Sequence, residues 1–249
     1  PVGRGGTTKR YHYHQRDLAL TMKNDMHRIF WLLLAGTLSS QAMAIDIGAM
    51  TIAMAPNEEF IARTVTNNSG SPKVYEVQME KISNPTATGT SVPTVPGELL
   101  FAPKRFTLHA KRMQNVKLYY KGPADGQERY YRITFTESPA AQLDESGQAR
   151  RRGALEMKLA LQSTLVVRPR QVRFQYQLDP ARSSITNTGN TYFEFMVKRG
   201  CQQADSEADS KYLLPGETYR NPKISQAGNQ KLIVYQSRFI RVGKDCWPD

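Results

Sequence analysis

Residues 154–167 read Ala-Leu-Glu-Met-Lys-Leu-Ala-Leu-Gln-Ser-Thr-Leu-Val-Val and make the longest run of strand-like sequence in the chain. Successive side chains of a β-strand point to opposite faces. One face of this strand therefore carries an apolar row of Leu155, Met157, Leu159 and Leu161. A central strand would bury that row in its own domain, whereas an edge strand could offer it to the sheet of another protein. The pattern alone leaves both alternatives open.

A long polar connection precedes this strand. It runs from Glu137 to Gly153 and ends in three consecutive arginines. A structureless loop of this length is uncommon in a compact domain and is often functional. A surface loop without a role is the other interpretation. A strand that follows such a loop can lie at the edge of its sheet, and this position favours the second alternative for the apolar row.

Short alternating runs continue on both sides of residues 154–167, and turn residues separate them. Pro169 marks a boundary, because proline cannot donate to a sheet ladder and stiffens the link. The pattern predicts an all-β chain of two β-sandwich domains, 45–167 and 168–249. The predicted strands are 45–55, 60–66, 73–82, 99–103, 105–108, 116–120, 129–136, 154–167, 172–176, 185–187, 192–197, 231–235 and 239–242.

The first 44 residues differ from the rest. Residues 1–25 show no periodicity, and we set them aside as a non-native or upstream segment. Residues 26–44 have the order of a secretory signal peptide, with a short basic start, an apolar run at 29–38 and Ala-Met-Ala at 42–44. A membrane anchor is the alternative, but a bilayer crossing needs about 20 apolar residues. We expect export and no membrane span in the mature protein.

The formal net charge of the chain is +12. Residues 1–44 hold six Lys or Arg and two Asp, which is +4, so +8 remains on residues 45–249. Such a basic protein could bind nucleic acid, but export argues against that partner. The remaining alternatives are a solvated surface of mixed charge and Lys or Arg side chains that bind a partner's carboxylate.

The histidines and cysteines restrict the chemistry. Three histidines precede residue 45, and only His109 remains. A Ser-His-Asp triad would have to use it, and a zinc site of several histidines is not available. We therefore predict no catalytic residue, metal or cofactor. Cys201 and Cys246 are the only cysteines, and in an oxidising compartment we expect them to pair.

Four blocks carry a resemblance to a known family: residues 119–125 (Tyr-Tyr-Lys-Gly-Pro-Ala-Asp), 128–133 (Glu-Arg-Tyr-Tyr-Arg-Ile), 164–171 (Thr-Leu-Val-Val-Arg-Pro-Arg-Gln) and 185–190 (Ile-Thr-Asn-Thr-Gly-Asn). In this order, and behind a signal peptide, they make the chain resemble the PapD-like periplasmic pilus chaperones. The nearest likeness is to the alternative chaperone–usher class, of the common-pilus and colonisation-factor type. The resemblance covers essentially all of residues 45–249.

The resemblance implies two immunoglobulin-like β-sandwich domains at an angle and a role in the periplasm. It implies a chaperone that folds and caps fimbrial subunits by donor-strand complementation and delivers them to an outer-membrane usher without a cofactor. The donor row would be Leu155, Met157, Leu159 and Leu161. A secreted structural pilin or adhesin subunit is the alternative function, and a hydrolase is disfavoured by the histidine and cysteine counts.

The resemblance also implies roles for charged residues. The family holds the subunit's terminal carboxylate with basic side chains, but the donor-strand position that carries Lys in the PapD branch is Thr164 here. Arg63 and Arg132 are the candidate anchors, and solvated strand residues are the alternative for both. Glu128 and Arg168 resemble a structural ion pair between the first domain and the hinge.

Overall fold

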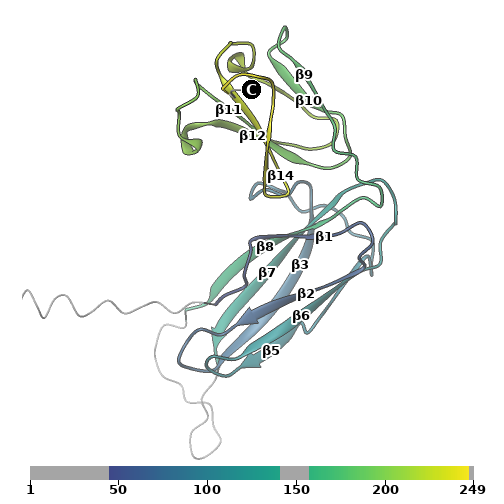
Figure 1. The fold of residues 1–249 in the computed structure, drawn as a ribbon. Helices are drawn as coiled ribbons and strands as arrows, with labels where there is room; N and C mark the ends of the chain where they lie inside the picture. The colour runs from purple at the N-terminus through teal and green to yellow at the C-terminus, as the bar shows by residue number, and fades with distance from the viewer. Residues whose placement is uncertain (1–44, 141–156, 247–249) are drawn as a thin grey trace, which may run out of the picture. The chain divides into compact units, whose positions relative to one another are not determined.

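The structure is a computed structural model that describes residues 45–140 and 157–246, and its strands group into two blocks (Figure 1). The predicted signal peptide, Leu155 and most of the predicted loop 137–153 lie outside the described residues. Within the described residues, no helix has the length and apolar character to cross a membrane.

The first block is a sandwich of a five-stranded sheet, in the order β1-β8-β7-β3-β5, and a three-stranded sheet, β2-β6-β4. Its strands are β1 (Thr51–Met54), β2 (Phe60–Thr66), β3 (Lys73–Ile82), β4 (Leu99–Ala102), β5 (Arg105–Leu108), β6 (Met113–Tyr120), β7 (Arg129–Pro139) and β8 (Leu159–Val167). Alternation in the sequence becomes alternation in burial, most plainly in β6, where Val116, Leu118 and Tyr120 are buried and the residues between them are exposed. These side chains share one core with Phe135 and Leu165 of the other sheet.

The second block has a three-stranded sheet, β13-β10-β9, and a four-stranded sheet, β12-β11-β14-β15. Its elements are β9 (Tyr176–Asp179), β10 (Ser184–Asn187), β11 (Phe193–Lys198), η1 (Asp205–Glu207), β12 (Asp209–Leu213), β13 (Thr218–Arg220), η2 (Pro222–Ile224), β14 (Gln230–Tyr235) and β15 (Arg238–Arg241). Ile185, Phe195 and Ile233 form the centre of a separate core. The predicted all-β fold of two sandwiches is confirmed.

The Cys201–Cys246 disulfide is present, with 5.2 Å between the two Cα atoms. It joins the segment after β11 to the segment after β15, so the predicted pairing is confirmed. The bond closes a loop of 45 residues in the second sandwich. Such a crosslink restricts the unfolded chain and stabilises a small domain by a few kcal/mol.

Several predicted boundaries were wrong. In the described residues β8 begins at Leu159 rather than at residue 154, and β7 continues through Glu137 to Pro139, so the predicted loop starts three residues too early. Residues 172–175 are not a strand, because the backbone there bonds the turn at Gly189 and Asn190 instead of a neighbouring strand. Strands β12 and β13 were missed because their sequences, DSKYL and TYR, show little apolar alternation.

Candidate functional site: an open edge on strand β8

Strand β8 is paired on both sides along only part of its length. Strand β7 pairs with all of it, from Arg129 opposite Val167 to Glu137 opposite Leu159. Strand β1 runs parallel on the other side and pairs only with Thr164 to Val167. The amide of Thr164, which donates to the carbonyl of Met50 at 2.7 Å, is the first bond on that side. In the described part of the chain, Leu159 to Ser163 therefore present an unpaired strand edge.

The apolar row of β8 emerges from the core along this open edge. Leu165 is fully buried, and Leu161 is partly buried against the same core. Leu159 is 39% exposed and Met157 is 78% exposed. Leu159, Leu161 and Leu165 lie on one face, since residues two apart share a face of a strand, and Met157 precedes the strand by two residues. The sequence-predicted row is thus the outer continuation of the domain's own core row, and its members become more exposed with distance from the core.

The path of the first described residues explains why the edge is open. Asp46 pairs with Thr66 of β2 through two backbone hydrogen bonds, of 3.2 and 2.9 Å. The chain then passes to the other sheet and joins β8 from Thr51 onward. Buried Ile45 and Ile47 hold the first residues in the core. Because Asp46 pairs with β2 and Ala49 is bonded by Arg63 of the same strand, the chain reaches β8 only at Met50 and does not pair with Leu159–Ser163.

Arg63, one of the predicted carboxylate anchors, lies at this crossing. Its side chain is buried, and its guanidinium donates to the carbonyl of Ala49. Burial lowers the pKa of Arg63, while the nearby Asp46 carboxylate opposes that change. Gly48 has a φ of +67°, and a Cβ there would lie 3.5 Å from the guanidinium. Arg63 therefore fixes the path of residues 48 and 49.

Arg132, the other predicted anchor, lies on the outward face of β7. It is directly opposite Thr164 of β8 on one side and Glu80 of β3 on the other. It donates to Glu80 Oε1 at 2.9 Å and to the carbonyl of Gly89 at 2.7 Å. Arg63 and Arg132 belong to different sheets of the sandwich, so the structure does not bring the two predicted anchors together.

Glu128 and Arg168 form a buried ion pair of 2.6 Å at the junction of the two blocks. Glu128 also accepts hydrogen bonds from the Thr191 hydroxyl at 2.6 Å and the Tyr192 amide at 2.9 Å. A further bond comes from the Tyr130 hydroxyl, and burial together with this carboxylate raises the pKa of Tyr130. Sequence reasoning found the pair but missed Thr191 and Tyr192, which give the carboxylate its partners before β11.

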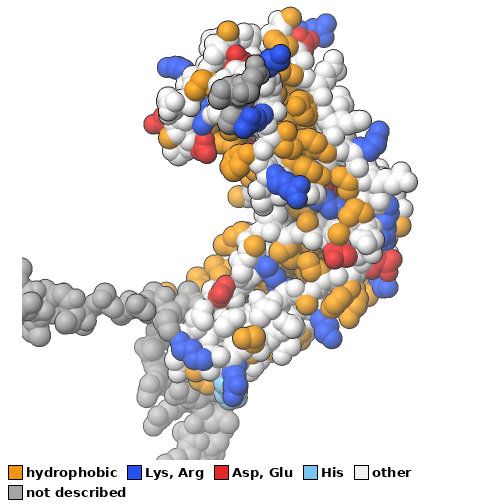
Figure 2. Space-filling view, in the orientation of Figure 1, with side chains coloured by type: hydrophobic (Ala, Val, Ile, Leu, Met, Phe, Trp, Pro, Cys, Tyr) orange, Lys and Arg blue, Asp and Glu red, His pale blue; other side chains and the backbone are white. Residues whose placement is uncertain are grey.

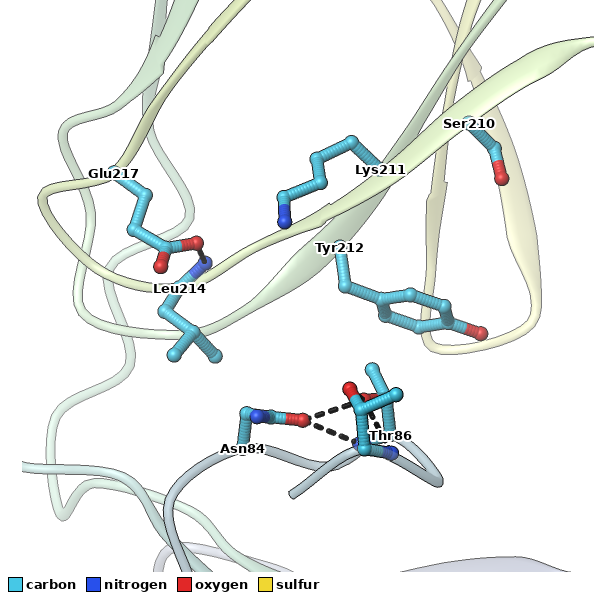
Figure 3. A pocket seen from close by; sticks show the side chains of 8 residues that line it. Asn84, Thr86, Ser210, Lys211, Tyr212, Leu214 and Glu217 are labelled. Atoms are coloured by element: carbon cyan, nitrogen blue, oxygen red, sulfur yellow. Dashed lines mark hydrogen bonds between the residues drawn. The ribbon is translucent and has the colours of Figure 1, made fainter. Parts of the chain in front are cut away.

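A small cavity of about 210 Å³ lies between the segment after β3 and strand β12 (Figure 3). Asn84 and Thr86 line one wall and are hydrogen-bonded to each other, and Lys211 and Tyr212 line the other.

In the described residues no group of three or more His, Cys, Asp or Glu could hold a metal ion. His109 is exposed in the turn after β5, where its carbonyl accepts from the Arg112 amide at 3.2 Å.

Comparisons with known proteins agree with this geometry. No protein-family model matches the chain. Two solved structures share its fold: the periplasmic chaperone SfaE (TM-score 0.52, 14% identity, 80% of this chain and 98% of the other) and the class 5 fimbriae chaperone CfaA (0.51, 15%, 80% and 93%). The chain therefore has the two-domain fold of these chaperones.

Sequence relatives identify the family. A protein of Escherichia coli O18:K1:H7 described as "Probable fimbrial chaperone EcpE" is 36% identical over 203 residues, covering 82% of this chain and 86% of the relative. "Probable fimbrial chaperone EcpB" of Klebsiella pneumoniae subsp. pneumoniae is 32% identical over 207 residues, covering 82% and 91%. The chain belongs to the fimbrial chaperones. The alternative of a structural pilin or adhesin subunit is not favoured.

Proposed function

We propose that this chaperone caps a fimbrial subunit in the periplasm by completing the subunit's sheet with the open edge of β8, and then delivers it to an outer-membrane usher. The observation that carries the mechanism is the unpaired edge from Leu159 to Ser163, combined with the exposed row of Leu159 and Met157 beside it. Leu155, which lies outside the described residues, precedes Met157 by two positions in the sequence, and we include it in the proposed row.

The proposed mechanism needs only non-covalent chemistry. An incoming strand would receive backbone hydrogen bonds from the edge and pockets for alternate side chains. Burial of each large apolar side chain contributes about 1.5–3 kcal/mol before the cost of ordering. No catalytic residue, metal or cofactor takes part in this mechanism, so we propose that the chaperone is not an enzyme.

Arg132 is our proposed anchor for the subunit's terminal carboxylate. It lies opposite Thr164, just past the point where the open edge ends, and its head faces away from the core. Its present partners are a partly exposed carboxylate, Glu80, and the loop carbonyls of Gly89 and Ala87, which an incoming carboxylate could replace. Arg63 is buried and donates a hydrogen bond to the carbonyl of Ala49, so we do not assign it this role.

The donor strand is tested by co-expression with the fimbrial subunit encoded beside it. Leu159→Glu introduces a charge into the proposed row, whereas Ala160→Glu introduces the same charge at an exposed position on the opposite face of the strand. We expect the wild type and Ala160→Glu to purify as one-to-one complexes and Leu159→Glu to purify alone and folded. Capture of the subunit by Leu159→Glu would overturn the donor assignment.

A second pair of variants tests the anchor. Arg132→Gln removes the charge, whereas Glu80→Gln removes only its present partner. We expect Arg132→Gln to weaken subunit binding at least tenfold and Glu80→Gln to leave it unchanged or tighter. Equal losses in both variants would mean that the ion pair acts structurally.

A further inference from the structure

Three large apolar side chains lie in a row across the outer face of the β2-β6-β4 sheet. Phe60 of β2 and Leu100 of β4 are both directly opposite Tyr119 of β6. The rings of Phe60 and Tyr119 are 4.8 Å apart between their centroids. Phe60, Tyr119 and Leu100 are 43%, 38% and 49% exposed, respectively. We call these three residues the β2-β6-β4 row.

The fold does not require this row. The neighbouring residues Ile61, Leu118 and Phe101 point the other way and pack in or against the core. Grouped apolar side chains on the surface of a soluble protein mark interaction sites more often than isolated ones do, and aromatic residues dominate the energetic centres of interfaces. Figure 2 shows apolar side chains gathered over the β2 and β6 region with Lys and Arg side chains beside them.

The surroundings of the row are basic. Lys117 lies two residues from Tyr119 on the same face of β6, directly opposite Ala62 and Ala102, and it forms no ion pair within the described residues. At the other end, Lys121 and Arg170 share the single carboxylate of Glu59, at 4.0 and 3.2 Å. Lys117, Lys121 and Arg170 therefore lie near the row, and the carboxylate of Glu59 pairs with two of these three cations. A second copy of this chain, whose net charge is also +12, is a poor electrostatic match.

We infer that the outer face of β2-β6-β4 is a second docking surface of this chaperone, and that it binds an acidic segment of a partner protein. An apolar side chain of that segment contacts the β2-β6-β4 row while a carboxylate two residues away pairs with Lys117. The spacing follows from the strand, because residues two apart on one face are about 7 Å apart. This surface lies on a different sheet from β8, so it remains available while the open edge holds a subunit.

The surface is tested with two short peptides and the isotope-labelled protein. The probes are acetyl-Asp-Gly-Phe-Gly-Asp-amide and its counterpart with both Asp replaced by Lys. In NMR titrations we expect the acidic peptide to shift resonances of β2, β4 and β6, and the lysine peptide to bind at least tenfold more weakly. Absence of localised shifts, shifts confined to other strands, or equal binding of both peptides would overturn the inference.

Variants separate this surface from the subunit site. Tyr119→Ser and Lys117→Glu should each weaken binding of the acidic peptide at least fivefold. Met113→Ser removes a more exposed apolar side chain on the same face of β6, about 20 Å away along the strand, and it should leave peptide binding unchanged. All three variants should still capture the fimbrial subunit. If Tyr119→Ser keeps its fold but no longer captures the subunit, the β2-β6-β4 row belongs to the subunit site. That result would overturn the inference of a separate docking surface.

Discussion

The two halves of strand β8 have the same alternating sequence and opposite surroundings. From Thr164 to Val167 the strand has a partner on each side, and Leu165 is fully buried. From Leu159 to Ser163 its only partner among the described residues is β7, and Leu159 is partly exposed. The sequence pattern alone therefore does not decide whether a stretch of β8 is buried, because its neighbours do. We propose that the paired half stabilises the domain and that the other half binds the fimbrial subunit.

The largest expected effect is a loss of stability at the Glu128–Arg168 ion pair, next to the paired half of β8. Glu128→Ala leaves Arg168 buried without its carboxylate and removes the acceptor of Thr191 and Tyr192. Loss of one partner of a buried ion pair costs about 3–5 kcal/mol. We expect the free energy of unfolding, measured by urea denaturation, to fall by that amount. If the free energy of unfolding falls by less than 1 kcal/mol, the ion pair does not stabilise the structure next to the paired half of β8.

The next effect contrasts the two halves directly. Leu165→Ala opens a cavity in the core and should destabilise the domain by about 2–5 kcal/mol. Leu159→Ala removes a partly exposed side chain, and we expect a loss below about 1 kcal/mol. Subunit capture in co-purification should show the reverse order, with the greater loss in Leu159→Ala among molecules that remain folded. The same ranking in both measurements would contradict the division of β8 into two halves.

A backbone substitution sharpens the contrast at neighbouring residues. The amide of Thr164 points toward β1, so the amide of Gln162 points to the same side, beyond the end of β1. Gln162→Pro should therefore change the free energy of unfolding by about 1 kcal/mol or less, since proline is tolerated where an edge N–H has no partner. It should still weaken subunit binding at least tenfold. Ser163→Pro, whose lost amide faces β7, is the control and should unfold the domain.

The smallest effect is on the pH dependence of stability. Hydrogen bonds from Arg129 lower the pKa of Asp125 from 3.8 to about 2. A folded-state pKa below the unfolded value means that the stabilisation is present above pH 3.8 and is lost as the pH falls to about 2. Asp125→Asn should flatten the urea-unfolding profile in this window and leave subunit capture unchanged at neutral pH. An unchanged profile would mean that this partly exposed pair is screened by solvent.

Much of the fold could be predicted, because alternation and turn residues act locally. The two sandwiches, the disulfide and the Glu128–Arg168 contact were all predicted and are present. The errors fell where local pattern is weak. Strands β12 and β13 are short and polar and were missed, and residues 172–175 look like a strand but bond a turn.

In the candidate site, too, some features follow from local sequence pattern and others depend on tertiary contacts. Alternation alone shows which β8 side chains share a face, because it is a property of a single strand. The open edge of Leu159 to Ser163 among the described residues depends on tertiary contacts, since Asp46 pairs with Thr66 of β2 and the chain reaches β8 only at Met50. The tertiary structure also separated Arg63, inside the sandwich, from Arg132, on its surface. Pairing and burial depend on residues far apart in the chain, and no local pattern records them.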